Sequence, residues 1–125
     1  MIRRLAFNVL IGNGDAHLKN WSLIYPDGIA ARLSPAYDLV ATVTYIAEDK
    51  LGLKLSKENR FDHIQLQHFE RLADQVGVTR ERVVGLVRNT IEQAMATWPE
   101  SSLDPDRVAR LRAHVERLPL LRDVR

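Results

Sequence analysis

The sequence contains no cysteine, and this absence excludes several kinds of chemistry at once. A chain without thiols forms no disulfide, performs no thiol catalysis and holds no metal through thiolates. It also lacks a long apolar run, because the opening segment 2–11 is interrupted by Arg3, Arg4 and Asn8. That segment is therefore neither a secretory signal nor a membrane span, and we expect a soluble cytoplasmic protein.

Charge of either sign is not in large excess. The 125 residues include 18 Lys and Arg against 16 Asp and Glu, so the formal net charge is +2 and the pI is about 9.2. So small an imbalance does not by itself indicate a polyanionic partner, and we do not expect direct binding to nucleic acid. The length suits a single domain with its own core, which we expect to span residues 1–125.

What the chain does contain is a polar segment, Ile11–Asn20, between apolar flanks. Asp15 followed five residues later by Asn20 is the spacing of a phosphotransferase catalytic loop. There the Asp accepts the proton of the attacking hydroxyl and the Asn holds magnesium. Asp38 adds a second acidic position, and a carboxylate between metal and nucleotide phosphates is what magnesium-dependent phosphoryl transfer needs. Each side chain alone also suits an ordinary loop or cap; together they predict a phosphotransferase site.

Two blocks of sequence, Asn13–Leu23 and Leu33–Leu39, resemble in order and spacing the catalytic core of the HipA-like serine/threonine kinases, the toxins of bacterial toxin–antitoxin pairs. Only fourteen residues precede Asp15, and they hold no glycine-rich loop, so the resemblance covers a C-terminal kinase lobe only. It implies phosphorylation of a protein serine or threonine, typically on an aminoacyl-tRNA synthetase. It also implies a HipB-like, DNA-binding antitoxin as partner.

The resemblance also assigns roles to individual residues. It implies Asp15 as the catalytic base, with ATP and Mg²⁺ as cofactors. Asn20 and Asp38 are then the residues that hold the metal and, with it, the nucleotide. His17 lies where many protein kinases carry a lysine, which implies a catalytic role; the alternative is a histidine that fixes the loop by hydrogen bonding.

A lobe without its upstream half leaves apolar surface uncovered. We therefore expect a separate N-terminal lobe to act in trans, or the free chain to associate with itself as a homodimer. A catalytically inactive helical interaction module, which binds partners through the same surface, is the alternative.

Hydrophobic periodicity predicts a mainly helical domain, like the C-terminal lobe of a kinase, with a small β-hairpin near the N-terminus. Glycine, proline and capping residues set the expected ends of its elements. We expect a helix stopped at Gly12, hairpin strands over 22–25 and 29–33 around an Asp27-Gly28 turn, a short strand over 50–56, and helices over 64–76, 79–98 and 104–118, closed by Gly77, Pro99 and Pro119.

A competing pattern lies in residues 72–83. Ala73, followed four residues later by Gly77, has the spacing of a helix-turn-helix, in which Arg80 and Arg82 would face DNA. A corner between two helices of a kinase lobe explains the same spacing, and we favour it because the motif is short and often matched by chance.

Overall fold

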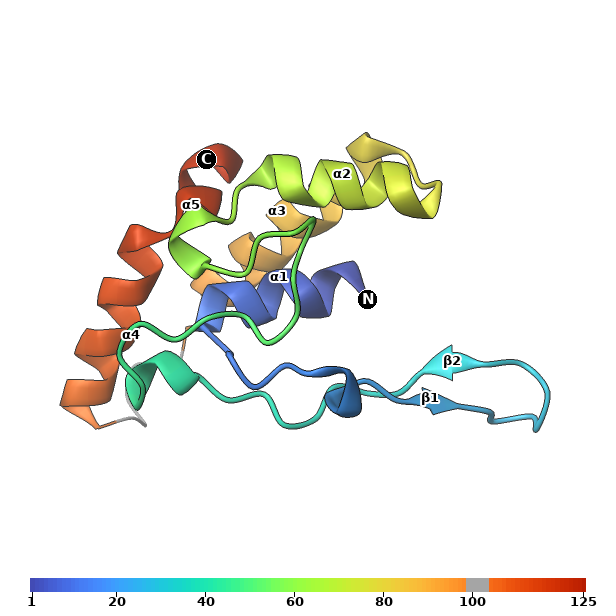
Figure 1. The fold of residues 1–125 in the computed structure, drawn as a ribbon, viewed down its shortest axis with the longest axis horizontal. Coiled ribbons are helices and arrows are strands. Elements are labelled where there is room, and N and C mark those ends of the chain that lie inside the picture. The colour runs from blue at the N-terminus through green and yellow to red at the C-terminus, as the bar shows by residue number, and fades with distance from the viewer. Residues whose placement is uncertain (99–103) are drawn as a thin grey trace.

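The first helix, α1 (Ile2–Ile11), runs through the middle of the computed structural model, which describes residues 1–98 and 104–125 (Figure 1). Ala6, Val9 and Leu10 are fully buried on it. The helix ends at Gly12, whose φ of 66° lies in the left-handed region that a residue without Cβ adopts at little cost. The predicted glycine stop is confirmed, and the polar segment begins where the helix ends.

Within residues 1–98 and 104–125, four further α-helices build the body together with α1. They are α2 (Leu66–Val76), α3 (Arg80–Ala96), α4 (Pro105–Arg117) and α5 (Pro119–Val124). Helix α3 packs along α1 and α2 packs on α3, while α4 crosses the C-terminal end of α1 (Figure 1). Their apolar faces meet in one core, whose largest fully buried side chains include Leu10, Leu51, Ile64, Phe69, Val83, Val87, Leu118 and Leu120.

The predicted helix boundaries are largely confirmed. Gly77 ends α2 with a φ of 69°, and Asp104 caps α4 by accepting a hydrogen bond of 3.2 Å from the backbone N–H of Asp106. Pro99 lies outside the described residues. Pro119 follows the end of α4 as predicted, and because proline also suits a first helical position, it begins a further helix, α5, that was not predicted.

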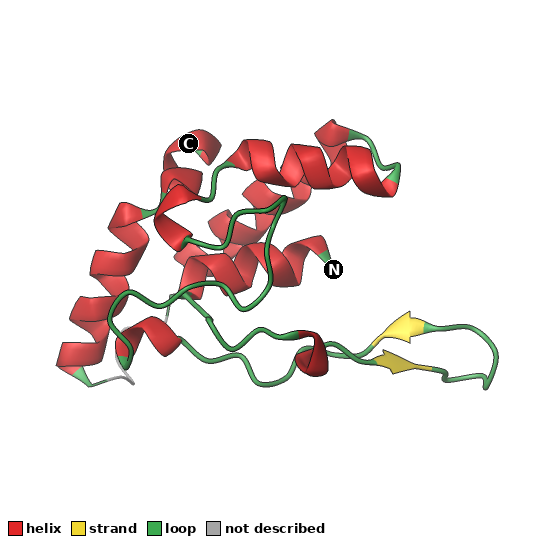
Figure 2. Ribbon diagram, viewed as in Figure 1, coloured by secondary structure: helices red, strands yellow, loops and turns green. Residues whose placement is uncertain are grey.

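The predicted hairpin is present but short. Strand β1 (Leu23–Ile24) pairs with β2 (Arg32–Leu33) in an antiparallel ribbon that projects beyond the helices (Figures 1 and 2). The carboxylate of Asp27 accepts hydrogen bonds from the backbone N–H groups of Ile29 and Ala30, at 2.9 and 2.8 Å. Those bonds keep residues 29 and 30 in the turn, so the expected strand 29–33 is reduced to its last two residues.

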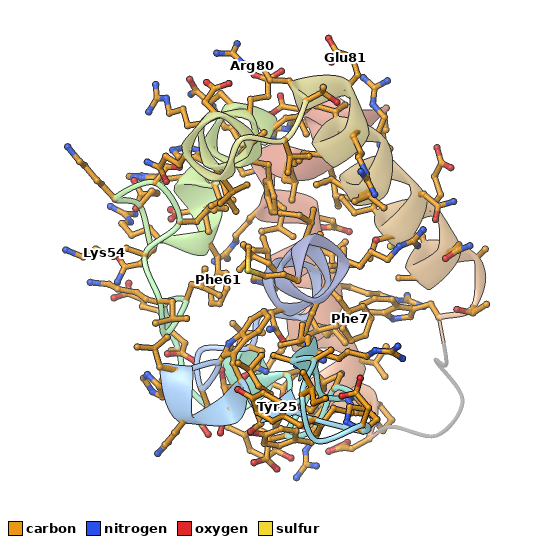
Figure 3. All side chains as sticks on the ribbon, turned by 90° about the vertical axis from the view of Figure 1, so that its right-hand side faces the viewer. Phe7, Tyr25, Lys54, Phe61, Arg80 and Glu81 are labelled. Carbon is orange, nitrogen blue, oxygen red and sulfur yellow. The ribbon has the colours of Figure 1, made fainter. Side chains whose placement is uncertain are left out.

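The strand predicted over Lys50–Ser56 does not form. Only an isolated bridge joins Leu55 to Glu58, around a turn whose residues Ser56 and Lys57 have φ values of 49° and 75°. Leu51 and Leu55 are buried in the core as separate anchors, and Lys54 points away from the body (Figure 3). The apolar alternation therefore reflects anchoring of a loop onto the helices.

The helix-turn-helix spacing of residues 72–83 forms a corner between α2 and α3. Ala73 is fully buried there, and α3 turns its own apolar face toward the core. Arg80 points outward (Figure 3), and its guanidinium makes two hydrogen bonds, of 2.9 and 2.7 Å, to the carboxylate of Asp74. The helical corner is the interpretation that this packing favours.

The architecture is mainly helical with a small hairpin near the N-terminus, as predicted. Among the residues that the structure describes, no helix combines the length and the apolar character needed to cross a membrane.

Candidate functional site

The polar segment after α1 is organised by Asn13, whose side chain is almost completely buried. Its Nδ2 donates to Oδ1 of Asn8 at 3.1 Å and to the backbone carbonyl of Asp38 at 3.3 Å. Its Oδ1 accepts from the backbone N–H of Asp15 at 3.1 Å. One side chain thus joins helix α1 to the two sequence blocks that carry the predicted site. Buried amides are stable only when their donors and acceptors are paired, so this arrangement is well defined.

Asp15 and His17 lie side by side on the outer surface of this loop. The Nε2 of His17 is 3.4 Å from Oδ1 of Asp15, and the two side chains are 49 and 54% exposed. The backbone N–H of His17 also donates to the carbonyl of Asp15, at 2.8 Å. Both predicted catalytic residues therefore share one accessible site, where the imidazole can orient the carboxylate.

Asn20 closes the same loop as the last residue of a 3-10 helix, Leu18–Asn20. Its side-chain Nδ2 donates to the backbone carbonyl of Asp15. An amide carries its donor and its acceptor on different atoms, so engaging the nitrogen leaves the oxygen available as an acceptor. Asn20 therefore lies beside Asp15 in space as well as in sequence.

Asp38 has an exposed side chain on a strained backbone, with a φ of 51° that non-glycine residues rarely adopt. Its neighbour Tyr37 reaches across to the segment around Asn20. The Tyr37 hydroxyl donates to the carbonyl of Lys19 at 3.1 Å and lies 2.6 Å from Oγ of Ser22. The hairpin thus brings the chain back, at Asp38, to the loop that contains Asn20, eighteen residues earlier in the sequence.

Arg4 ties the base of the hairpin to α1. Its guanidinium donates to the carbonyl of Ser34 and lies 5.1 Å from the centre of the Trp21 ring. Ser34 and Trp21 belong to the two hairpin arms, one leading to Asp38 and the other following Asn20. Helix α1 therefore holds both arms of the hairpin in addition to the loop.

Comparison with known proteins decides the family. The sequence model described as "HipA-like C-terminal domain" matches residues 1–98. This chain belongs to that family. The resemblance seen in the two sequence blocks is confirmed over more than three quarters of the HipA-like chain.

Curated relatives and a solved structure agree with this assignment. The chain is 45% identical over 98 residues to "Putative kinase Y4dM" and 31% identical over 101 residues to "Putative kinase Y4mE", both of Sinorhizobium fredii. These alignments cover 78 and 77% of this chain but 24% of each relative, so the chain spans about a quarter of their length. The fold is similar, with a TM-score of 0.67 and 24% identity, to a chain in a complex of HipA, HipB and operator DNA from Shewanella oneidensis. That similarity covers 98% of this chain and 31% of the other.

The residue types at positions 20 and 38 are compatible with magnesium that is also bound by a ligand. Within residues 1–98 and 104–125, no group of three or more His, Cys, Asp and Glu side chains is placed to hold a metal ion. Magnesium is commonly bound through one or two protein carboxylates or amides together with substrate phosphates and water. One carboxylate from Asp38 and one amide oxygen from Asn20 fit that requirement.

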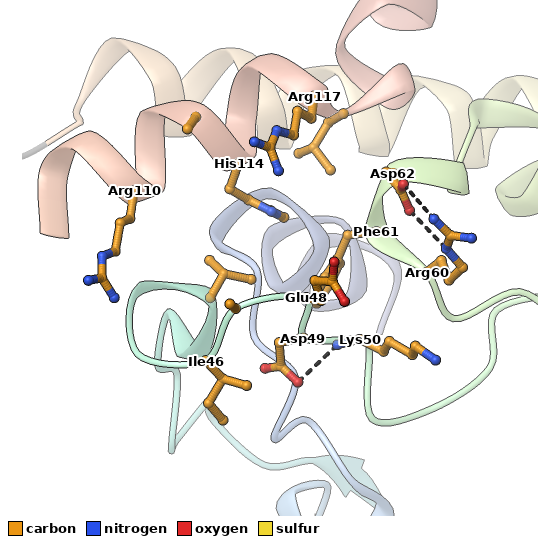
Figure 4. A pocket seen from close by; sticks show the side chains of 14 residues that line it. Ile46, Glu48, Asp49, Lys50, Arg60, Phe61, Asp62, Arg110, His114 and Arg117 are labelled. Atoms are coloured by element: carbon orange, nitrogen blue, oxygen red, sulfur yellow. Dashed lines mark hydrogen bonds and ion pairs between the residues drawn. The ribbon is translucent and has the colours of Figure 1, made fainter.

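A cavity beside α4 has none of the four predicted site residues in its lining. It measures about 720 Å³, between α4 and the segment that follows the hairpin (Figure 4). Its charged lining comprises Glu48, Asp49, Lys50, Arg60, Asp62, Arg110 and Arg117. Asp62 is neutralised by a two-pronged contact with Arg60, which lowers the pKa of its carboxyl. Because charges of both signs line the cavity, it does not by itself indicate which ligand it would bind. The cavity adjoins the loop through Asp49.

His114 fills the space between this cavity and the end of α1. Its Nε2 lies 3.0 Å from the carbonyl of Val9, and its ring meets that of Phe61 edge-on at 5.1 Å between centroids. Burial lowers the pKa of His114 below its usual 6.5, which outweighs the opposing effect of the hydrogen bond to Val9. The imidazole is therefore neutral at pH 7 and donates from Nε2.

Sequence reasoning missed the residues that support the loop from inside. Asn8 and Asn13 are buried, Thr42 touches the loop backbone, and Asp49 contacts Thr42. The one available signal was Asn8, a polar residue inside an otherwise apolar helical segment. The sequence around Thr42 and Asp49 gave no such signal, because their role depends on contacts with residues about thirty positions away.

Proposed function

We propose that this chain is the catalytic lobe of a magnesium-dependent kinase that transfers phosphate from ATP to a serine or threonine of another protein. The observation that carries the proposal is the buried side chain of Asn13, which binds the backbone of both Asp15 and Asp38. A base and a metal-binding carboxylate from separate segments must be held together for in-line phosphoryl transfer.

Asp15 is the proposed base. Its carboxylate is about half exposed and accepts the proton of the substrate hydroxyl as that oxygen attacks the γ-phosphorus and the bond to the β-phosphate oxygen breaks. His17, 3.4 Å away, holds the carboxylate in orientation. In this role His17 supports the base and does not itself exchange a proton with the substrate.

Asn20 and Asp38 are the proposed metal ligands. Bound magnesium neutralises charge on the ATP phosphates. The side-chain nitrogen of Asn20 is held by the carbonyl of Asp15, so its oxygen is the atom that would bind the metal. The Tyr37 hydroxyl donates to the carbonyl of Lys19, which ties the residue before Asp38 to the residue before Asn20.

The remaining parts of the enzyme lie outside this sequence in the proposal. Because the chain spans about a quarter of its curated relatives, a separate N-terminal lobe would cover the nucleotide from the other side. A HipB-like antitoxin is the proposed partner, by analogy with the similar chain that is found with HipB and operator DNA. An aminoacyl-tRNA synthetase is the proposed substrate class, which follows from the family resemblance alone.

Calorimetric titration of Mg-ATP into the chain tests this proposal. Asp38→Asn removes one negative charge while keeping the side chain's shape, and Glu92→Gln makes the same change on the exposed surface of α3. We expect the dissociation constant to rise about tenfold or more for Asp38→Asn, the effect of losing one charged metal contact of ~1.4 kcal/mol or more. Glu92→Gln is expected to bind as the unmodified chain does.

Two results would count against the proposal. Equal affinities of Asp38→Asn and Glu92→Gln would remove Asp38 from the nucleotide site. A heat of binding that does not depend on magnesium would remove the metal from the mechanism.

A further inference from the structure

The inner side of the catalytic loop rests on a short 3-10 helix, Thr42–Thr44. The backbone N–H of Gly14 donates to Oγ1 of Thr42 at 2.7 Å, and the same Oγ1 lies 3.0 Å from the carbonyl of Gly12. The backbone N–H of Val43 donates to that carbonyl at 3.2 Å. The peptides on both sides of Asn13 are therefore held by one threonine and its neighbour.

Asp49 determines which way the Thr42 hydroxyl points. Its Oδ2 accepts from Oγ1 of Thr42, and its Oδ1 accepts from the backbone N–H of Lys50 at 2.9 Å. A hydroxyl has one hydrogen and two lone pairs, and a carboxylate is a stronger acceptor than a carbonyl. With its hydrogen committed to Asp49, Thr42 presents a lone pair to the N–H of Gly14.

Gly14 lies so close to Asp49 that no side chain fits between them. A Cβ at residue 14 would lie 2.6 Å from Oδ1 of Asp49 and 2.5 Å from its Cγ. The φ of Gly14 lies outside the left-handed region, so its backbone would tolerate alanine. The need for glycine at this position therefore comes from the approach of Asp49.

We propose that Asp49 is a positioning residue for the loop that carries Asp15, acting through the hydroxyl of Thr42 on Gly14. Gly14 directly precedes Asp15, so holding the Asn13–Gly14 peptide through this N–H restricts the backbone that leads into Asp15. The inference rests on the proposed function, since a positioned carboxylate matters only where Asp15 acts as base. Because Asp49 also lines the cavity beside α4, it places the inner side of the loop against that cavity (Figure 4).

Hydrogen exchange at the Gly14 amide tests the bracing without any nucleotide. Asp49→Ala and Thr42→Val are expected to speed exchange of this amide about tenfold, the factor for one lost hydrogen bond. Thr42→Ser restores the hydroxyl and is expected to restore protection. Thr44→Val is the matched control: its hydroxyl donates to the carbonyl of Ala41 at 2.7 Å, within the same segment, and does not reach the loop. Unchanged exchange in Asp49→Ala would overturn the inference.

A double substitution tests the close approach. Gly14→Ala alone is expected to lower the melting temperature by about 5 °C, because overpacking strains the contact with Asp49. Combining it with Asp49→Ala opens the space and is expected to recover most of that loss. Two losses that simply add would show that Asp49 does not constrain residue 14.

Binding of Mg-ATP connects the bracing to the proposed site. Asp49→Ala and Thr42→Val are expected to raise the dissociation constant several-fold, and Thr42→Ser and Thr44→Val to leave it within about twofold, less than one hydrogen bond contributes. If the unmodified chain does not bind Mg-ATP, the proposed function fails while Gly14 exchange still decides the bracing. If Asp49→Ala binds normally although its Gly14 amide exchanges fast, Asp49 supports the loop without positioning the site, and the inference fails alone.

Discussion

Burial of His114 links the stability of the helical body to pH. Its folded-state pKa lies below 6.5, whereas the unfolded chain titrates near 6.5, so between these values the unfolded chain binds more protons. Stability therefore rises with pH across this window and is lost as the pH falls below about 6.5. Neighbouring Arg117 acts in the same direction, because its positive charge also disfavours the imidazolium.

We predict that the free energy of unfolding decreases between pH 7.5 and 5, by up to about 1.4 kcal/mol for each unit that separates the two pKa values. His114→Gln keeps a donor for the carbonyl of Val9 but does not titrate, so its stability should be nearly independent of pH in this range. Denaturant unfolding at several pH values measures both. The carboxyl pKa of Glu58 is lowered from 4.5 and contributes only at lower pH. An equal slope in His114→Gln would assign the effect to other groups.

At the same scale, the roles of Asp15, Asn20 and Asp38 stay predictions, but these residues could be singled out as candidates from their spacing. The residues that hold them in place could not be predicted in this way. Asn13 reaches Asp38 across twenty-five positions, and Thr42 reaches Gly14 across twenty-eight. Such contacts depend on how the chain packs, and neither asparagine nor threonine in a loop differs locally from a solvated residue.

Among the elements, those with local causes could be predicted best. Gly12 and Gly77 end helices because the left-handed backbone there is strained for other residues, and Asp104 begins one because its side chain accepts a backbone N–H. The strand over 50–56 was wrong because alternation alone does not provide a partner strand. There the N–H of Leu51 donates to the carbonyl of Asn59 at 2.8 Å, within the same loop.

The hairpin connects the two segments that carry the predicted metal ligands. Its two ends carry Asn20 and Asp38, and two strand pairs alone hold a ribbon weakly. The Tyr37 hydroxyl adds contacts to Lys19 and Ser22 at the end nearest the site. The Tyr37 hydroxyl therefore adds to the contact of Asn13 with the Asp38 backbone in holding Asp38 near Asn20.

We predict that Tyr37→Phe weakens Mg-ATP binding about three- to tenfold, as expected for ~1 kcal/mol of lost hydrogen bonding. Calorimetry measures the affinity. Tyr25→Phe, a hydroxyl removed from an exposed tyrosine at the other end of the hairpin, serves as the matched control. Similar affinities in the two variants would mean that the Tyr37 hydroxyl is not needed to hold Asp38 in place.

Across the whole molecule, the family match and the folded unit do not coincide. The match ends at residue 98, yet Val115, Leu118, Leu120 and Leu121 lie in the same core as α1 and α3. His114 and Arg110 also contact the backbone of Val9 and Thr44. Helices α4 and α5 are thus part of the body that supports the loop, including its Thr42–Asp49 side.

The hairpin also exposes an apolar surface to solvent. Leu23, Tyr25 and Ile29 are 59, 55 and 86% exposed on an arm that extends away from the helices (Figures 1 and 3). Clustered apolar side chains on a projecting ribbon favour association, because pairing removes them from water. Such a surface suits either another lobe of a kinase or a second copy of this chain, and only the second is available to the chain in isolation.

We therefore predict that the free chain self-associates through the hairpin. Sedimentation velocity over a hundredfold range of concentration should show a mass that rises from monomer toward dimer. Leu23→Ser combined with Ile29→Ser should shift this transition to higher concentration, because it removes apolar surface without touching the core. Val76→Ser, at a half-exposed position near the end of α2, should leave it unchanged. A monomer mass at every concentration would refute the association, and equal behaviour of the hairpin variant and the control would place it elsewhere on the surface.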